Sequence, residues 1–152
     1  MTDTDYMKLA LEEANEGAKK DEVPVGAIGV WKGEIIARAH NRKEEKQNAI
    51  AHAEMEVLEQ AAKRCGNWYL DELEMYVTLE PCPMCAGAML NARIKRLVFG
   101  AFDPKGGAAG SKLNLLEEGG FNHTVAVTGG VMQEECGAIL TEFFRNKRRK
   151  LC

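Results

Sequence analysis

Three side chains of the types that bind zinc, with one carboxylate beside them, lie in two short segments of this 152-residue chain. The four residues are His52, Glu54, Cys82 and Cys85, and both cysteines belong to the segment Pro81-Cys82-Pro83-Met84-Cys85. A structural zinc is usually closed by four protein ligands, whereas a catalytic zinc keeps three and leaves the fourth position to water. One histidine and two cysteines therefore predict a catalytic zinc site, with Glu54 outside the ligand set.

The two cysteines are predicted to lie at the start of a helix. Proline suits the first helical position because it has no backbone N–H to leave unpaired, so Pro83 indicates where the helix begins. Residues three apart share one side of a helix, so the sulfurs of Cys82 and Cys85 can reach the same point. The free N–H groups and the positive dipole end at that terminus favour thiolate over thiol, which helps metal binding.

His52 and Glu54 are predicted to open a second helix, whose small and apolar positions recur from Ala51 to Ala62. Because they are two residues apart, both side chains reach one site only from the first turn. A water beside a catalytic zinc loses a proton near neutral pH, and a nearby carboxylate can accept that proton and pass it to the substrate. In a hydrolytic reaction, Glu54 could therefore serve two steps, by protonating first the attacked substrate and then the leaving group.

Each half of this pattern also has a simpler explanation. A Cys-x-x-Cys pair alone could be a redox pair or half of a zinc ribbon, and a His-x-Glu pair on a helix is often a solvated surface. A ribbon requires a second cysteine pair at similar spacing, but Cys65, Cys136 and Cys152 are single and scattered. The combination favours the catalytic site, and we interpret the three other cysteines as structural or incidental thiols.

Length and composition are typical of one compact enzyme domain over residues 1–152. The hydrophobic content of 45% is sufficient for a buried core. The first five residues have neither a basic leader nor an apolar run, and no stretch approaches the ~20 apolar residues of a membrane span. We therefore expect a cytoplasmic protein with no membrane partner.

Positive charge is concentrated in a basic helix end predicted at residues 145–152. This segment has no acidic residue, and its cations are Arg145, Lys147, Arg148, Arg149 and Lys150. Without these five, the 20 basic residues fall to 15 against 23 acidic ones, so residues 1–144 carry a net charge of −8. Such a cluster is a candidate phosphate contact, and the adjacent Phe143 and Phe144 could stack on bases. Alternatively, the cations stabilise the helix end or are simply solvated, and the phenylalanines pack in a core or interface.

The expected elements alternate between helices and strands. Hydrophobic periodicity predicts helices near residues 3–19, 52–62, 84–93 and 132–147, and strands near 25–31, 34–40, 75–79, 96–101 and 125–128. Lys32-Gly33 is a predicted hairpin turn. The strand at 75–79 leads directly into the cysteines, so the site is expected where a strand ends and a helix begins. We predict an α/β fold whose mixed or parallel sheet is covered by helices on both faces.

The chain resembles the bacterial tRNA-specific adenosine deaminases, members of the cytidine deaminase-like superfamily. The segments that carry this resemblance, in order, are Glu22–Ala27, His40-Asn41, His52–Glu54, Pro81–Ala88 and the Gly-rich loop Asp103–Ser111. The zinc motif alone is shared with cytidine, cytosine and guanine deaminases, so the loop and the tail at 143–150 carry the narrower resemblance. The resemblance implies a three-layer α/β/α sandwich with a five-stranded mixed sheet and one Zn²⁺ per subunit. It also implies a homodimer that converts the wobble adenosine of a tRNA anticodon loop to inosine.

The resemblance assigns roles to individual residues. It makes His52, Cys82 and Cys85 the zinc ligands and Glu54 the catalytic proton shuttle. It places Pro24, Val25 and Asn41 near the flipped base, although Asn41 is equally interpretable as a turn residue. The other candidate RNA contacts are Asp103, Lys105, Phe143, Phe144, Arg145 and Arg148. Glu80 is interpreted as a structural hydrogen-bonding residue, His40 as a packing residue or support for the site, and His123 as a surface or RNA-facing group.

Two other functions remain open at the level of the sequence. A small-molecule guanine or cytosine deaminase would use the same zinc chemistry without needing the basic tail. A non-catalytic, zinc-stabilised RNA-binding module would need neither Glu54 nor an open ligand position. The sequence alone does not show which base the pocket accepts, because that choice depends on the shape of the pocket walls.

Overall fold

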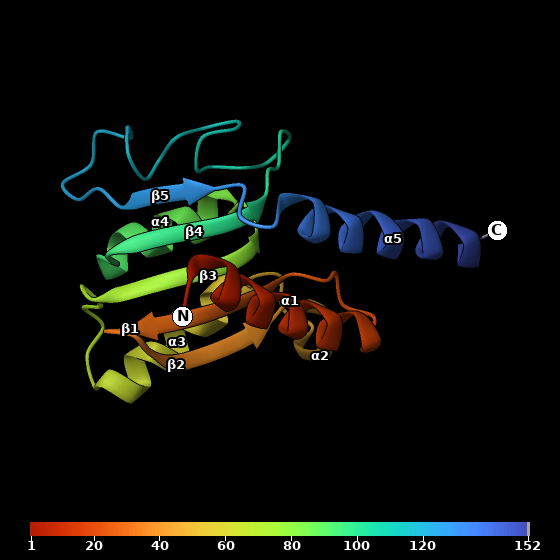
Figure 1. Cartoon of the computed structure of the whole chain (residues 1–152), viewed down its shortest axis with the longest axis horizontal. Coiled ribbons are helices and arrows are strands. Elements are labelled where there is room, and N and C mark those ends of the chain that lie inside the picture. Colours follow the sequence, from red (N-terminus) through yellow and green to blue (C-terminus); the bar gives the residue numbers. More distant parts are fainter. Residues whose placement is uncertain (152) are drawn as a thin grey trace.

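A five-stranded sheet lies between two layers of helices in the computed structural model, which describes residues 1–151 and side chains through Arg149 (Figure 1). The strand order is β2-β1-β3-β4-β5. Strand β1 (Gly26–Trp31) pairs antiparallel with β2 (Glu34–His40) and with β3 (Leu73–Leu79). Strands β3, β4 (Arg96–Ala101) and β5 (Ala126–Gly129) are parallel. The predicted three-layer sandwich with a mixed sheet is therefore confirmed.

Burial along the strands follows their position in the sheet. The central strands β1, β3 and β4 are buried along almost their whole length, as expected for strands covered on both faces, while the edge strands β2 and β5 are largely accessible. The predicted turn between β1 and β2 is confirmed, since Lys32 and Gly33 have φ values of 49° and 83°. Positive φ at both turn residues matches the right-handed twist of a hairpin.

Helices α1 (Asp3–Lys19) and α5 (Gln133–Leu151) cover one face of the sheet, and α3 (Ala53–Cys65) and α4 (Pro83–Ala92) cover the other (Figure 1). Thr2 begins α1 with a capping box to Asp5. The sequence pattern missed α2 (Lys43–Lys46), which has only four residues and no buried side chain. The predicted basic helix end is the last part of α5, although Cys152 and the side chain of Lys150 lie outside the described residues.

The candidate site residues converge at one end of the sheet. Strands β3 and β4 are parallel, and the cysteine segment and the loop Asp103–Ser111 follow their C-terminal ends. Both segments therefore leave the sheet at the same end. Strand β1 begins there and β2 ends there, because Gly26 pairs with His40. Four segments that are distant in sequence therefore meet around the start of α3 and α4. None of the described helices is long and apolar enough to cross a membrane.

Candidate active site

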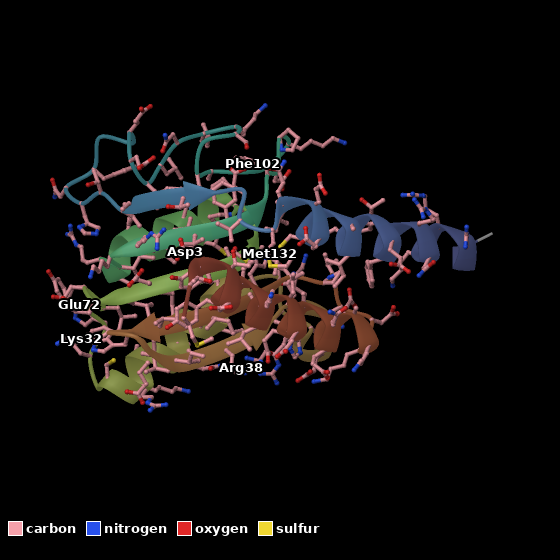
Figure 2. All side chains as sticks on the ribbon, viewed as in Figure 1. Asp3, Lys32, Arg38, Glu72, Phe102 and Met132 are labelled. Carbon is pink, nitrogen blue, oxygen red and sulfur yellow. The ribbon has the colours of Figure 1, made fainter. Side chains whose placement is uncertain are left out.

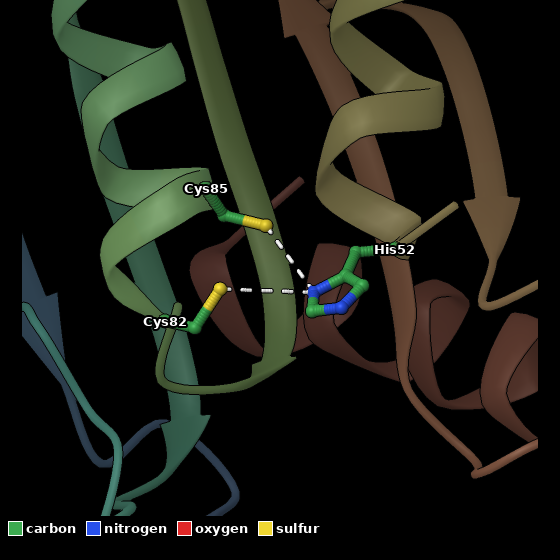
Figure 3. A group of neighbouring side chains, drawn as sticks. All are labelled: His52, Cys82 and Cys85. Carbon is green, nitrogen blue, oxygen red and sulfur yellow. Dashed lines mark hydrogen bonds between the residues drawn. The ribbon is translucent and has the colours of Figure 1, made fainter. Parts of the chain in front are cut away.

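His52, Cys82 and Cys85 form a compact group of metal-binding side chains (Figure 3). Their ligand atoms all lie within 4.8 Å of one another. Both sulfurs face Nδ1 of His52, at 3.7 Å from Cys82 and 3.5 Å from Cys85. The structure thus brings together the three residues that the sequence predicts as ligands.

These distances fit a tetrahedral metal site. Zinc binds histidine nitrogen at about 2.0–2.1 Å and cysteine sulfur at about 2.3 Å, so two such ligands on one tetrahedral ion lie about 3.6 Å apart. The observed separations of 3.5 and 3.7 Å agree with that value. Little rearrangement would be needed for the three atoms to bind one ion.

The first turn of α3 presents His52 to this group because another residue caps the helix. His52 is the N-cap residue, with extended backbone angles, but its side chain makes no capping hydrogen bond. Instead, Oδ1 of Asn41 accepts a hydrogen bond from the backbone N–H of Ala53 at 2.8 Å. Asn41 therefore satisfies a free donor of the helix end, and the imidazole remains available to the metal.

The first turn of α4 presents the two cysteines. Cys82 is the N-cap residue, Pro83 occupies the first turn as predicted, and Cys85 is fully buried. Hydrogen bonds from Cys85 and then from His52 lower the pKa of Cys82 to about 3, whereas the hydrogen bond to Cys82 raises the pKa of Cys85. The lowered pKa of Cys82 favours its thiolate, which is the form of cysteine that binds a metal.

Glu54 is a buried carboxyl group in the same turn of α3 as His52. Only 4% of the residue is exposed, and this burial raises the pKa of Glu54 to about 7. A hydrogen bond with the side chain of Glu54 contributes to the raised pKa of the Cys85 thiol, so the two side chains lie next to each other. A carboxyl group that gains and loses a proton near neutral pH is suited to general acid–base catalysis.

The predicted base-binding residues Pro24, Val25 and Asn41 form one buried neighbourhood. The backbone N–H of Asn41 donates to the carbonyl of Val25 at 3.1 Å, so the segment before β1 lies against the residue after β2. Among the described residues, Nδ2 of Asn41 has no protein partner, while Oδ1 is occupied by Ala53. The role of Asn41 toward a base stays a prediction, with Nδ2 as the free donor.

The loop Asp103–Ser111 lies against the cysteine segment. The backbone N–H of Ala108 donates to the carbonyl of Pro81 at 2.8 Å. Oδ1 of Asp103 accepts from the backbone of Lys105 and Gly106, both at 3.1 Å, so this carboxylate shapes its own loop. The Lys105 residue is exposed. Glu80 is almost fully buried and hydrogen-bonds to the loop, as interpreted from its place in the sequence.

A cavity of about 260 Å³ connects α5 to the neighbourhood of Asn41. Its lining residues on α5 are Phe143, Phe144 and Lys147, and the others are the segment Asp21–Val23 with Asn41, Lys43 and Glu44. Lys147 pairs with Asp21 at 3.3 Å, whereas Arg145 and Arg148 are exposed. Phe143 and Phe144 thus border the same cavity as Asn41, and their stacking on RNA bases stays a prediction.

Two structural features near the site were not predicted from the sequence. Glu22 is 1% exposed, and its carboxylate accepts from the backbone of Glu44 and Glu45 at 3.1 and 2.8 Å, which fixes α2. An apolar groove of about 420 Å³ runs over α3 and α4, with exposed Ile50 and Trp68 at its edge. Both depend on tertiary contacts. The acidic residue directly after α1 was the available hint of the Glu22 contact, and the long apolar stretch on α4 was the available hint of the groove.

The two other histidines lie in structural contacts. Nδ1 of His40 lies 3.2 Å from Oε1 of Glu13 on α1, in agreement with its interpretation as a packing residue. Nε2 of His123 donates to the carbonyl of Ile94 at 3.0 Å. That bond occupies one ring nitrogen of His123, so its proposed contact with RNA would have to use the other.

Comparisons with known proteins agree with this geometry. A family model described as MafB19-like deaminase matches residues 1–148. The tRNA-specific adenosine deaminase of Bacillus subtilis (strain 168) is 56% identical over 145 residues, covering 95% of this chain and 90% of that protein. A solved structure from studies of A-to-I editing by tRNA:A34 deaminases superposes with a TM-score of 0.87 at 44% identity, covering 90% of this chain and 99% of that one.

A guanine deaminase from Bacillus subtilis is a more distant relative. Its structure gives a TM-score of 0.64 at 36% identity, and the match covers 67% of this chain and 66% of that one. Identity and coverage are both higher for the tRNA-specific enzymes. This chain belongs to the MafB19-like deaminase family and, within it, to the tRNA-specific adenosine deaminases.

Proposed function

We propose that residues 1–152 act as one zinc-dependent deaminase domain that hydrolyses adenosine to inosine at the wobble position of a tRNA anticodon. The observation that carries the proposal is the buried Glu54 beside a three-ligand metal group. The relative with 56% identity is named as a tRNA-specific adenosine deaminase, and the solved structure with 44% identity comes from studies of A-to-I editing at the wobble position of transfer RNA, so both support this substrate here. The proposal places the enzyme in the cytoplasm, where it would meet tRNA.

Zinc is the metal that best suits the donor set. Two thiolates and one imidazole are soft to intermediate ligands, and their spacing fits tetrahedral coordination with a fourth position left for water. When bound, zinc would supply the positive charge that makes a water molecule nucleophilic at neutral pH. The ligands would be His52, Cys82 and Cys85.

Glu54 would carry the protons of the reaction. It would accept a proton from the attacking water and deliver it to the ring nitrogen next to the amino-bearing carbon. It would then move the hydroxyl proton to the amino group as the carbon–nitrogen bond breaks. One water is consumed and one ammonia is released, so the carboxyl group returns to its starting state. A pKa of about 7 suits both transfers.

RNA recognition is proposed for the segments around the cavity. The target base must leave its stack, and loop bases that are already unstacked leave most easily. Pro24, Val25 and Asn41 would hold the base, with Nδ2 of Asn41 donating to it. The flanking nucleotides would meet Asp103 and Lys105 on one side and the α5 residues on the other. Those α5 residues are Phe143, Phe144, Arg145 and Arg148.

A second copy of the chain is the proposed occupant of the groove over α3 and α4. Ile50 and Trp68 are 53% and 66% exposed at its edge, and the groove is lined mainly by apolar side chains. Large exposed apolar patches on soluble proteins commonly mark interfaces, and the same patch on two subunits can form a twofold dimer. Because α3 and α4 begin at the metal group, such a dimer would hold its two active sites near the interface.

The alternatives predict different substrates, so a substrate panel tests the proposal. Zinc-loaded protein is incubated with an anticodon stem-loop carrying adenosine at the wobble position, and separately with free adenosine, cytidine, cytosine and guanine. We expect inosine from the stem-loop and far slower or no conversion of the small molecules. Preferred conversion of guanine or cytosine would replace the proposal, and RNA binding without conversion of any substrate would favour the non-catalytic module.

A further inference from the structure

Glu80 binds both ends of the loop that lies against the metal-binding turn. Its Oε1 accepts from the backbone of Asp103 at 3.0 Å and from the hydroxyl of Ser111. Its Oε2 accepts from the backbone of Ala109 and Ser111 at 3.1 and 3.0 Å. The residue is 2% exposed, so its carboxylate is shielded from solvent while the loop supplies its hydrogen-bond donors. All four partners are donors, which matches the acceptor capacity of one carboxylate.

The loop leaves no room around this carboxylate. A Cβ on Gly107 would lie 2.3 Å from Cδ of Glu80, so only glycine allows the backbone to pass so close. The loop also forms a hydrogen bond to Pro81, the residue after Glu80, because the backbone N–H of Ala108 donates to its carbonyl. Glu80 is two residues before Cys82, so one short stretch of backbone supports both the metal group and the loop.

We propose that Glu80 is a positioning residue that fixes the Asp103–Ser111 loop relative to the metal group, and thereby sets the affinity for RNA rather than the rate of chemistry. The carboxylate has no acceptor position left for a substrate, because the loop fills all four. Its effect on RNA passes through Asp103 and Lys105, which the loop carries. This last step rests on the proposed function.

Glu13 is the matched comparison for Glu80. Its side chain is 17% exposed and bonded to Arg38 and His40, and it lies on α1, which covers the face of the sheet opposite to α3 and α4. Both residues join elements that are distant in sequence. Replacing either carboxylate should lower the stability of the protein, but only the replacement of Glu80 should make the Asp103–Ser111 loop less ordered.

The test uses Glu80→Gln in the full-length, zinc-loaded protein, with Glu13→Gln as the control. Glutamine keeps the shape but turns one acceptor oxygen into a donor, so two of the four bonds are lost. We expect faster amide hydrogen exchange at Asp103, Ala109 and Ser111 and normal zinc content. The KM for the stem-loop should rise about tenfold with kcat nearly unchanged, the pattern of lost uniform binding. Ser111→Ala, which removes one donor, should show a smaller change in the same direction.

Each readout has an outcome that overturns the inference. Unchanged exchange in the loop would mean that Glu80 does not hold it. Faster exchange throughout the protein, or the same loop exchange in Glu13→Gln, would reduce Glu80 to a general stabilising residue. A loosened loop with unchanged KM would remove the link to RNA. If the parent protein converts no RNA, the proposed function fails, while hydrogen exchange still decides whether Glu80 orders the loop.

Discussion

At the scale of residues, the site contains side chains that could bind a metal and side chains that hold them in place. His52 can serve as a ligand because Asn41 caps α3 in its stead. Glu54 is the one buried carboxyl group beside the metal group with a strongly raised pKa among the described residues. Perturbed groups of this kind gather at catalytic sites because their task requires proton exchange near neutral pH.

Replacing Glu54 by Gln should abolish turnover without emptying the metal site. The amide keeps the size of the side chain but cannot accept a proton, and loss of a positioned acid–base group costs about 10²–10⁴-fold in rate. Zinc content and inosine formation are measured on the same sample. Zinc loss in proportion to the lost activity, or near-normal turnover, would exclude Glu54 as the proton shuttle.

The grouping of His52 with Glu54, and of Cys82 with Cys85, could be predicted because each pair lies within three residues along the chain, where helix geometry alone brings the side chains together. The cap by Asn41 and the four bonds of Glu80 join residues that lie 12 to 31 positions apart. No local pattern encodes such contacts. The sequence therefore predicted which side chains gather at the site, but not the hydrogen-bond partners that support them.

At the scale of elements, a cluster of polar side chains attaches the start of α1 to the sheet. Figure 2 shows Asp3 there, over the strands. Its carboxylate accepts from Arg96 of β4 at 2.7 and 3.0 Å and from the hydroxyl of Tyr76 of β3 at 2.9 Å. The hydrogen bonds from Arg96 hold the pKa of Asp3 below its usual value. The cluster ties the first helix to two central strands that lead into the site.

Asp3→Asn should lower the free energy of unfolding by about 1 kcal/mol at pH 7, a modest value because Asp3 is 34% exposed. A carboxyl group with a lowered folded-state pKa stabilises the protein above its unfolded pKa of about 3.9, and this contribution is lost as the pH falls through the folded-state pKa. Denaturant unfolding at pH 7 and below pH 3 measures the difference in free energy of unfolding between the parent and Asp3→Asn, which should shrink at the lower pH.

Glu12→Gln, in an exposed pair with Arg38, is the control and should have little effect. A pH-independent loss would show that packing, not charge, is responsible.

The regular helices and strands were predictable because their apolar periodicity is strong, whereas α2 was not. Its four residues carry no buried side chain, and Glu22, 21 positions before Lys43, holds its first turn through backbone hydrogen bonds. Isolated turns of this length are unstable without such support.

At the scale of the whole molecule, two surfaces remain to be occupied: the groove over α3 and α4, and the exposed end of α5. The first is apolar and the second is basic. The basic end projects beyond the sheet in Figure 1. The groove suits a second copy of the chain, and the basic end suits phosphates.

Placing a charge at the edge of the groove should separate the dimer. Trp68→Glu and Ile50→Glu each bury an unpaired carboxylate if two copies associate there, which is strongly unfavourable. Sedimentation equilibrium should show dimers for the parent and monomers for both variants. Phe121→Glu is the control, since Phe121 is 58% exposed and lies outside the groove. A parent that is monomeric at all concentrations, or variants that remain dimeric, would contradict the assignment.

Removing charge from the end of α5 should weaken RNA binding without unfolding the helix. Arg145, Arg148 and Arg149 are exposed, so changing all three to Gln leaves the Lys147–Asp21 pair intact. The slope of log affinity against log salt should become shallower by about 0.7–0.9 for each phosphate that the variant no longer neutralises. A control variant in which three exposed lysines elsewhere, Lys8, Lys32 and Lys63, are changed to Gln loses the same net charge. Equal effects in both triple variants would mean that the end of α5 has no specific contact with RNA.

The central claim, hydrolytic deamination of one RNA base, is tested most directly by incubating the zinc-loaded protein with an anticodon stem-loop in oxygen-18 water. Mass spectrometry of the digested RNA then locates the product and its oxygen. We predict inosine at the wobble position alone, with one oxygen-18 atom at carbon 6 and an uncleaved backbone. Prior chelation should prevent the reaction, and added zinc should restore it. Absence of inosine, inosine without the label, or full activity after rigorous metal removal would contradict the account.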